Sequence, residues 1–145
     1  MSRSFAVLED SAERAAAMQA VLAGLAPGCE PRFFDNAPDM VEWLRGNLEK
    51  VAGLSLDHDL GPNRERGGQV FDPGVGRDVV DFLERQAPAC PVIIHSSNSQ
   101  AALGMRLALE GAGWQCRRVV PLFATDWIAG PWAETVQSLL GGAGI

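Results

Sequence analysis

The amino-acid sequence predicts an α/β fold, a (βα)5 doubly wound parallel sheet of five strands with helices on both faces. Two observations predict it. Five short apolar segments alternate with stretches of helical spacing, which is the chain order of a parallel sheet with right-handed crossovers. No internal repeat or linker interrupts the 145 residues, so we expect a single domain over residues 1–145. The expected strand order is 2-1-3-4-5, with a crevice between the first and third strands.

The first half of the chain supplies two strands and two helices. Residues 4–8 form the first strand, and the helix after it has Asp10 as its expected N-cap and Glu13 at the capping-box position. Residues 31–34 form a weaker second strand, and the next helix starts near Asn36. Apolar residues at helical spacing support both helices. They are Met18, Val21, Leu22, Leu25, Val41, Leu44 and Leu48.

The rest of the chain repeats the alternation three times. We predict strands over residues 51–56, 91–95 and 116–120, and helices over residues 77–86, 99–110 and 131–140. Trp132 falls on the apolar stripe of the last helix, which indicates a core position.

A loop over residues 61–76 departs from this regularity. Connections in α/β units usually take about 2–6 residues, so this one is long. It follows an acidic strand end and carries Arg64, Arg66 and Arg77. We expect a lid whose arginines supply cations to an acidic site, and a disordered excursion is the alternative.

Composition limits the class of protein. With 47% hydrophobic and 21% charged residues and no apolar run near the roughly 20 residues of a membrane span, we expect a cytoplasmic protein with no membrane partner. The net charge of −6 argues against binding duplex nucleic acid but permits a pocket for one phosphate. Cys29, Cys90 and Cys116 fit neither a disulfide framework nor a thiolate metal site, so we expect small buried apolar residues.

Both histidines of the chain stand where a predicted strand ends. One lies in Asp57-His58-Asp59, and His95 closes the fourth strand. Because ligands bind at the carboxyl ends of the strands in such sheets, we expect the two imidazoles to converge there. Our catalytic candidates are His58, His95, Asp57 and Asp59, with the imidazoles as acid and base. A structural polar role is the alternative for either histidine.

Carboxylates gather at the same edge of the predicted sheet. Glu9 and Asp10 follow the first strand and Asp57 follows the third, so their like charges need a cation or a proton between them. These three are our candidate metal ligands, and a hard divalent ion such as Mg2+ is the expected cofactor. Alternatively, Asp10 caps a helix and Glu9 is a solvated carboxylate.

Hydrogen-bond donors and one cation could hold a phosphoryl group. The substrate-binding candidates are Ser96, Ser97, Asn98, Arg106 and Trp127. The first three stand at the start of a helix, whose dipole favours an anion. Plain capping by Asn98 and a solvent-facing Arg106 are the alternatives.

The whole-chain pattern resembles a response-regulator receiver domain, which implies a flavodoxin-like fold. Glu9-Asp10 is similar to the receiver acidic pair, Asp57 to its phosphoacceptor and Ser96 to the hydroxyl residue after its fourth strand. Receivers also place a lysine at the end of the fifth strand. This chain has a single lysine, Lys50, ahead of the third strand.

A narrower set of motifs resembles the cyclic-phosphate-processing receiver-like family. The motifs are Leu56-Asp57-His58-Asp59-Leu60-Gly61, His95-Ser96-x-Asn98, Met105 and Ala112-Gly113-Trp114. The resemblance implies processing of cyclic phosphate ends of RNA, with a site made of Asp57, His58, Asp59, His95, Ser96 and Asn98.

Three functions therefore stay open at this point. The first is an enzyme that hydrolyses a cyclic phosphate at an RNA terminus or in a small cyclic nucleotide. The second is an atypical receiver that signals to a partner, with or without phosphorylation of Asp57. The third is a degenerate receiver that serves only protein contact, including formation of a homodimer.

Overall fold

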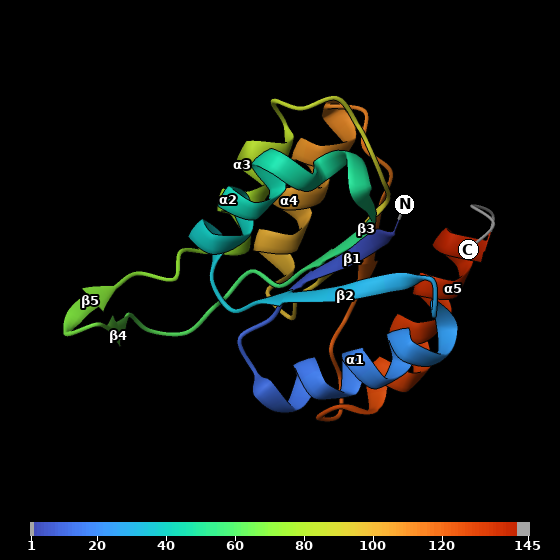
Figure 1. The fold of residues 1–145 in the computed structure, drawn as a ribbon, viewed down its shortest axis with the longest axis horizontal. Coiled ribbons are helices and arrows are strands. Elements are labelled where there is room, and N and C mark those ends of the chain that lie inside the picture. Colours follow the sequence, from blue (N-terminus) through green and yellow to red (C-terminus); the bar gives the residue numbers. More distant parts are fainter. Residues whose placement is uncertain (1, 142–145) are drawn as a thin grey trace.

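A computed structural model describes residues 2–141 and confirms the predicted sheet. Five parallel strands lie in the order β2-β1-β3-β6-β7, which is 2-1-3-4-5 when the strands of this sheet are counted along the chain (Figure 1). The strands are β1 (Arg3–Leu8), β2 (Cys29–Phe34), β3 (Val51–Leu56), β6 (Val92–His95) and β7 (Cys116–Val119).

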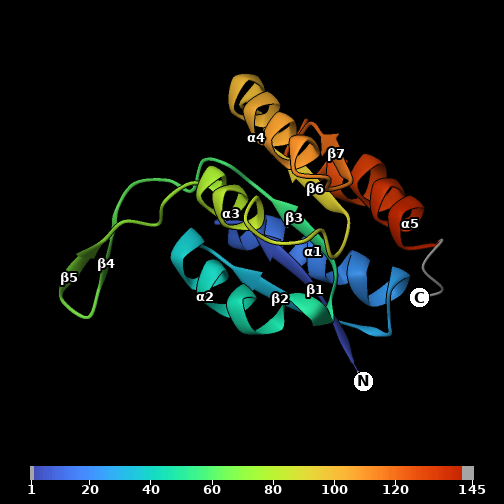
Figure 2. The same cartoon turned by 90° about the horizontal axis from the view of Figure 1, so that it is seen from above.

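Helices cover both faces of the sheet, as predicted. On one face lie α1 (Ala12–Leu25) and α5 (Ala133–Gly141), and on the other lie α2 (Ala37–Asn47), α3 (Gly76–Leu83) and α4 (Ser99–Gly111) (Figures 1 and 2). A 3₁₀ turn (Leu48–Lys50) leads into β3, and a π-helical turn (Ile128–Trp132) precedes α5. The backbone is non-helical at Gly130 (φ −99°, ψ −108°), so the last predicted helix, residues 131–140, begins just after this kink.

Each strand contributes to two hydrophobic cores, because successive side chains point to opposite faces. Leu54, Leu56 and Ile94 pack under α2, α3 and α4, whereas Val7 and Ile93 pack under α1 and α5. His95 follows Ile93 by two residues and therefore points to the α1/α5 side. Trp132 is fully buried in this second core, as the sequence predicts.

Helix α1 begins one residue later than expected. The N-cap is Ser11, whose hydroxyl accepts a hydrogen bond from Arg14 N at 3.2 Å. The prediction that Asp10 caps this helix with Glu13 in a capping box is wrong. Ser11 has the extended backbone of an N-cap (φ −86°, ψ 118°), and its own N donates to Glu9 Oε2 at 3.0 Å.

The long loop after β3 forms a hairpin instead of a lid. Strands β4 (Arg64–Arg66) and β5 (Gln69–Phe71) pair antiparallel and project from the body (Figures 1 and 2). Gly67 and Gly68 turn the chain with φ of 60° and 81°, as a two-residue hairpin turn requires. The root is held by Arg64, whose Nη1 lies 2.9 Å from Asp35 Oδ2.

Arg64 and Arg66 supply cations to carboxylates near the strand ends, as we expected, whereas Arg77 does not. Arg66 pairs with Asp39 at 3.1 Å, and Arg77 pairs with Asp81 at 2.9 Å on its own helix. Asp39 at the start of α2 and Asp81 on α3 thus offset the charges of Arg66 and Arg77.

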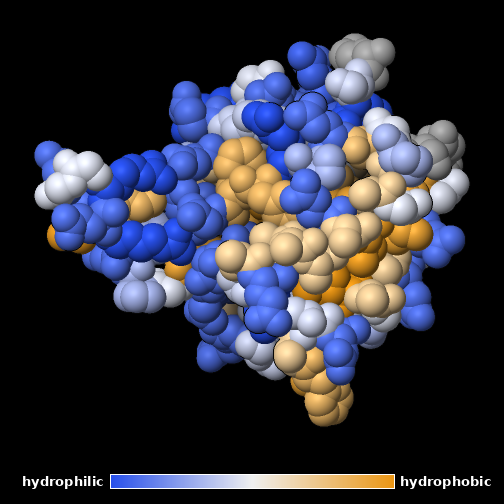
Figure 3. All heavy atoms as spheres, turned by 60° about the horizontal axis from the view of Figure 1, so that its bottom comes forward, coloured by the Kyte–Doolittle hydropathy of each residue, from blue (hydrophilic) through white to orange (hydrophobic). Residues whose placement is uncertain are grey.

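The surfaces of the molecule differ in polarity. The hairpin is mostly hydrophilic, whereas an apolar area lies on the face shown in Figure 3. Small side chains on the outside of α1 contribute to such a surface: Ala12, Ala16, Ala20 and Ala23 are exposed. Within residues 2–141, no helix has both the length and the apolar character to cross a bilayer.

The three cysteines are free thiols, as the sequence predicts. Cys29 and Cys116 are buried in the two cores, and Cys90 is partly buried. Burial raises the pKa of Cys90 and of Cys116 to about 12, so both thiols stay protonated and unreactive near neutral pH.

Candidate functional site

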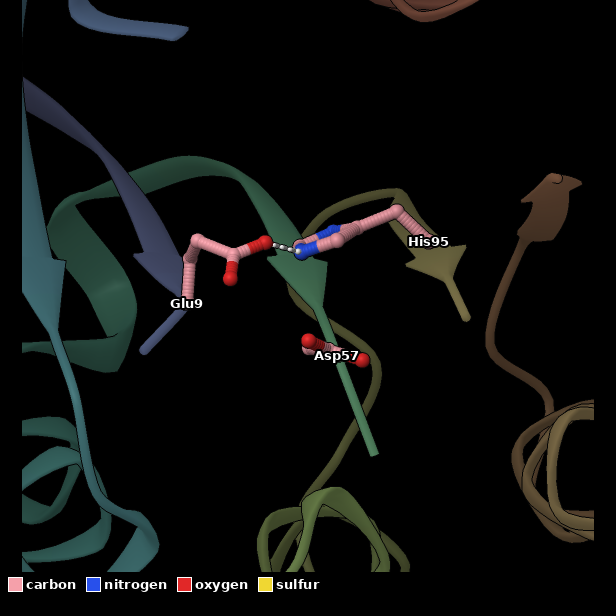
Figure 4. A group of neighbouring side chains, drawn as sticks. All are labelled: Glu9, Asp57 and His95. Atoms are coloured by element: carbon pink, nitrogen blue, oxygen red, sulfur yellow. Dashed lines mark hydrogen bonds and ion pairs between the residues drawn. The ribbon is translucent and has the colours of Figure 1, made fainter. Parts of the chain in front are cut away.

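Strand pairing brings three titratable side chains to the carboxyl edge of the sheet. Glu9 N donates to Phe34 O at 2.9 Å and Asp57 N donates to Leu8 O at 3.1 Å, so the pairing continues just past β1 and β3. His95 ends β6 beside them (Figure 4). One oxygen or nitrogen atom from each of Glu9, Asp57 and His95 lies within 4.8 Å of the other two. All three residues are buried.

Glu9 is held by groups that favour its charged form. Its Oε1 lies 3.2 Å from His95 Nε2 and 3.8 Å from Arg14 Nη1. Burial alone would raise the pKa of Glu9, but the hydrogen bond and charge of His95, with Ser11 N and Arg14, lower it below the ordinary value. The alternative of a solvated Glu9 is therefore wrong, because its side chain has no exposed surface.

A chain of buried hydrogen bonds orients His95. Trp132 Nε1 donates to Ser55 Oγ at 2.9 Å, and Ser55 Oγ lies 2.6 Å from His95 Nδ1. Because Ser55 accepts from Trp132, its own hydroxyl proton is free for Nδ1, which leaves the Nε2 proton for Glu9. The Trp127 ring stacks on the imidazole with centroids 5.7 Å apart. The imidazole is thus fixed on several sides and has no exposed surface.

Asp57 is a buried carboxyl that titrates near neutral pH. Burial raises its pKa to about 6; the charges of Glu9 and Asp10 add to the effect, and the charge of His95 and the His58 N–H oppose it. The one side-chain hydrogen bond of Asp57 within residues 2–141 runs from His58 N to Oδ1 at 2.7 Å. Its second carboxylate oxygen, Oδ2, is left for a proton or a ligand.

Asp10 stands at the rim of this cluster. It is exposed, and partial burial together with the neighbouring Glu9 charge raises its pKa above the ordinary value. Gly61 lies against it, since a Cβ there would sit 3.2 Å from Asp10 Oδ2. Gly61 also has a φ of 77°, so both its conformation and its neighbour favour glycine.

A hollow of about 360 Å³ opens next to the carboxylates. Glu9 and Asp10 line it together with Asp35 and Asp39 from the region after β2. Arg64 and Arg66 offset the charges of Asp35 and Asp39, so the side of the hollow that Glu9 and Asp10 form is the side that suits a cation. The donor atoms of Glu9, Asp57 and His95 are close enough to share one metal ion, so the residues present fit a divalent cation.

The structure does not bring the two imidazoles together. His58 lines a separate hollow of about 320 Å³ with Arg77 and with Asn98, Gln100 and Gly104 of the α4 region. Its Nδ1 is buried without a hydrogen-bond partner among residues 2–141. His95 points instead under α1 and α5, because of strand alternation, and cannot touch a substrate in this conformation. The expectation of one shared hollow is therefore wrong.

The remaining candidates near His58 play mostly local roles. Asn98 caps α4 by accepting from Ala101 N at 3.0 Å, and its Nδ2 lies 3.4 Å from Asp59 Oδ2. Ser96 is buried and accepts from Asn98 N at 3.1 Å, whereas Ser97 is exposed. Asp59 is also exposed. These residues surround the strand ends, as the sequence predicts.

Arg106 and Trp127 lie away from both hollows. Arg106 pairs with Glu110 at 3.1 Å, one turn further from the sheet edge, as in the solvent-facing alternative. Trp127 is 2% exposed and contacts His95 and Arg14 instead of open space. The structure therefore does not support substrate contact by either side chain.

Three residues that matter were not found from the sequence. Ser55 is the one that the sequence could have indicated, because it is a polar residue inside an apolar strand. No pattern in the sequence indicates Arg14, because an arginine on a helix usually faces solvent. Arg118 of β7 donates to Ser96 O at 2.9 Å, and only its position near the end of the fifth strand of the sheet could have pointed to it.

The sheet order, the acidic pair after β1 and the aspartate after β3 define a response-regulator receiver domain. The chain also matches the family model described as the cyclic-phosphate processing Receiver domain over residues 8–111, more than half of its length. The chain belongs to this family, which confirms the resemblance seen in the sequence.

Solved receiver domains share the fold at low sequence identity. The phosphorylated cyanobacterial phytochrome response regulator RcpA is similar with a TM-score of 0.70 and 13% identity over 98% of this chain and 96% of that one. The BeF3-activated receiver domain of nitrogen regulatory protein C has a TM-score of 0.64 and 17% identity over 99% of this chain and 98% of that one. The Mn(2+)-bound response regulator Rcp1 has a TM-score of 0.65 and 14% identity over 94% of this chain and 92% of that one. No curated protein sequence matches the chain.

Proposed function

We propose that this domain hydrolyses a cyclic phosphate, at the 2′,3′-cyclic end of an RNA or in a small cyclic nucleotide. The observation that carries the proposal is Asp57: a carboxyl with a pKa of about 6, buried beside Glu9 at the strand ends, with Oδ2 free of hydrogen bonds within residues 2–141. The family of the chain supports the substrate class.

The reaction needs two proton transfers. A base takes a proton from the attacking water, and an acid protonates the ribose oxygen that leaves phosphorus. Asp57 can do the first through Oδ1, which accepts one hydrogen bond from His58 N, while Oδ2 is left for the cation of the proposed site. His58 is the second group, since it is the next residue in the chain, is partly exposed and lines the hollow toward which the phosphate is proposed to lie.

The phosphate itself is proposed to lie toward the His58 hollow. Arg77 supplies a cation there, and Asn98 and Gln100 supply amide donors at the start of α4. Arg77 also contacts Asp81, so it would have to share its guanidinium with a substrate. Asp59 and Ser97 lie exposed near this edge and would contact the nucleotide portion.

A divalent cation completes the proposed site. Glu9 and Asp57, with Asp10 at the rim, would hold it, and such an ion neutralises phosphate charge and favours attack at phosphorus. His95 acts in this proposal as a positioning residue, because it contacts Glu9 and no open space.

The test is a cleavage assay on RNA ending in a 2′,3′-cyclic phosphate, with and without EDTA. We expect Asp57→Asn and His58→Gln each to lower turnover by at least about 10²-fold. Glu49→Gln is the matched control, because this exposed carboxylate precedes β3 at the opposite edge of the sheet. Wild-type turnover in both variants, or no cleavage of any cyclic phosphate by the wild-type protein, would overturn the proposal.

A phosphorylated signalling domain is the second candidate. It is favoured by the position of Asp57 at the end of β3 and by likeness to RcpA and NtrC receivers described as phosphorylated and BeF3-activated. Against it, no lysine stands near the end of β7, since Lys50 is the single lysine of the chain. Incubation with acetyl phosphate and Mg2+, followed by intact mass analysis, separates the two. A phosphoryl adduct lost in Asp57→Asn, without cyclic-phosphate cleavage, would establish signalling.

A further inference from the structure

We propose that His95 Nε2 is a metal ligand, completing a centre of two carboxylates and one imidazole that prefers Mn2+ and similar transition ions to Mg2+. The inference rests on the proposed cation at this site and adds the identity of its ligands and of the ion. It replaces the all-oxygen site expected from the sequence.

The geometry of the three donors suits one ion. Ligands at about 2.1 Å from a metal lie about 3 to 4 Å from each other. Glu9 Oε1 and His95 Nε2 are 3.2 Å apart, and a donor atom of Asp57 lies within 4.8 Å of both. Figure 4 shows the imidazole nitrogen directed at the Glu9 carboxylate, with Asp57 alongside. A small movement of Asp57 closes the centre.

Asp57 offers an independent sign of a missing partner. The residue is 7% exposed, and its one side-chain hydrogen bond within residues 2–141 uses Oδ1 and the adjacent backbone. Oδ2 makes no hydrogen bond within residues 2–141 and is not among the fully buried side-chain atoms, so one oxygen of this largely buried carboxyl is open to a ligand. Buried charges are normally paired or bound to a metal, so this oxygen calls for a cation.

The surroundings of His95 are those of a metal-binding histidine. Such a residue donates its other ring N–H to an acceptor that sets the ring orientation. Ser55 Oγ lies 2.6 Å from Nδ1 and can accept as well as donate, because a hydroxyl rotates. The Trp132 N–H fixes Ser55, and the Trp127 ring covers one side of the imidazole. When Nδ1 carries the proton, Nε2 presents its lone pair to the Glu9–Asp57 side.

The donor set and the burial together decide the preferred ion. Mg2+ takes oxygen ligands, demands near-ideal octahedral geometry and keeps several waters. Imidazole suits transition ions, which bind N and O sites increasingly tightly from Mn2+ upward. A centre whose three ligands are all buried leaves little room for a water shell. Mn2+ therefore fits these residues better than Mg2+.

The decisive measurement detects the nitrogen directly. Pulsed electron paramagnetic resonance of bound Mn2+ shows modulation from a coordinated imidazole ¹⁴N. The chain has two histidines, so His58→Gln leaves His95 as the single source of that signal. We expect the modulation to persist in His58→Gln. Bound Mn2+ without nitrogen modulation, or no Mn2+ binding at all, would overturn the inference.

Affinity supplies the second readout. Calorimetric titration should give Mn2+ binding at least about tenfold tighter than Mg2+ binding, and His95→Gln should weaken Mn2+ by about 10–100-fold while changing Mg2+ little. Equal affinities for the two ions would contradict the proposal. If His95→Gln does not fold, the spectroscopic result on His58→Gln still decides.

The two proposals fail in different ways. Nitrogen-coordinated Mn2+ in a protein that cleaves no cyclic phosphate would overturn the proposed function and leave the metal centre standing. Cleavage of a cyclic phosphate that depends on an ion held by oxygen atoms alone would support the proposed function and overturn the assignment of His95 as a ligand.

Discussion

The hydroxyl of Ser55 joins two buried groups from different parts of the fold, and its removal should weaken the folded state measurably. Ser55 has no exposed surface, and it contacts His95 Nδ1 at 2.6 Å and Trp132 Nε1 at 2.9 Å. Ser55→Ala leaves both nitrogens buried without that partner. Each unsatisfied group costs about 1–3 kcal/mol, so we expect the free energy of unfolding to fall by about 2–6 kcal/mol.

Urea denaturation followed by tryptophan fluorescence measures this loss. Ser97→Ala is the control, because Ser97 is exposed, and a surface substitution of this kind changes stability by less than about 0.5 kcal/mol. The double variant Ser55→Ala/Trp132→Phe removes one orphaned donor, so it should lose less than the sum of the two single variants. A Ser55→Ala protein as stable as the Ser97→Ala control would refute the hydrogen-bond chain described above.

Three other perturbations test the site and its neighbours. Asp57 binds its proton more tightly in the folded state, with a pKa of about 6 against 3.8, so the stability it contributes below about pH 4 is lost as pH rises through about 6. Urea denaturation in EDTA should therefore show that the free energy of unfolding of the wild type falls by about 3 kcal/mol relative to that of Asp57→Asn as pH rises through this range. A difference between the two proteins that does not change with pH would contradict the burial of Asp57. Gly76→Ala should destabilise the protein by more than about 2 kcal/mol in the same assay, because a Cβ there would overlap the Asp57 carbonyl. The control is Gly28→Ala, because Gly28 has open space around it. Equal losses of stability in the two variants would be evidence against this packing. Arg64→Gln should speed amide hydrogen exchange in the hairpin, because it removes an ion pair with Asp35 and a hydrogen bond to Leu60 O. We expect global stability to fall by less than about 2 kcal/mol, and unchanged exchange would show that Arg64 does not anchor the hairpin.

Strand positions and strand-end residues could be predicted from the sequence because apolar runs and helical spacing are local signals. The sheet order followed from the alternation of strands and helices, and the edge that collects Glu9 and Asp57 followed from that order. Helix caps were harder. Asp10 and Ser11 are adjacent residues that both favour the N-cap position, so local propensity did not choose between them, and the structure has Ser11.

The direction in which His95 points could not be taken from a motif. Its position at the end of a strand predicts nearness to the edge, but the face depends on the two-residue period counted from Ile93. Burial then depended on Ser55 and Glu9, which lie far from His95 in the chain. The hairpin also escaped prediction, because its three-residue strands are mostly polar and carry no apolar alternation.

The hairpin has a practical use that follows from its anchoring. Its root is tied to the body through Arg64, whereas Gly67 and Gly68 form a turn with open space around both residues. Figure 1 shows the hairpin projecting from the body, and the turn follows Arg66, whose side chain contacts Asp39 of α2. A peptide tag or a dye-labelled segment inserted between the two glycines would extend into solvent and leave the catalytic candidates undisturbed, which makes this turn the natural attachment point for labelling the protein.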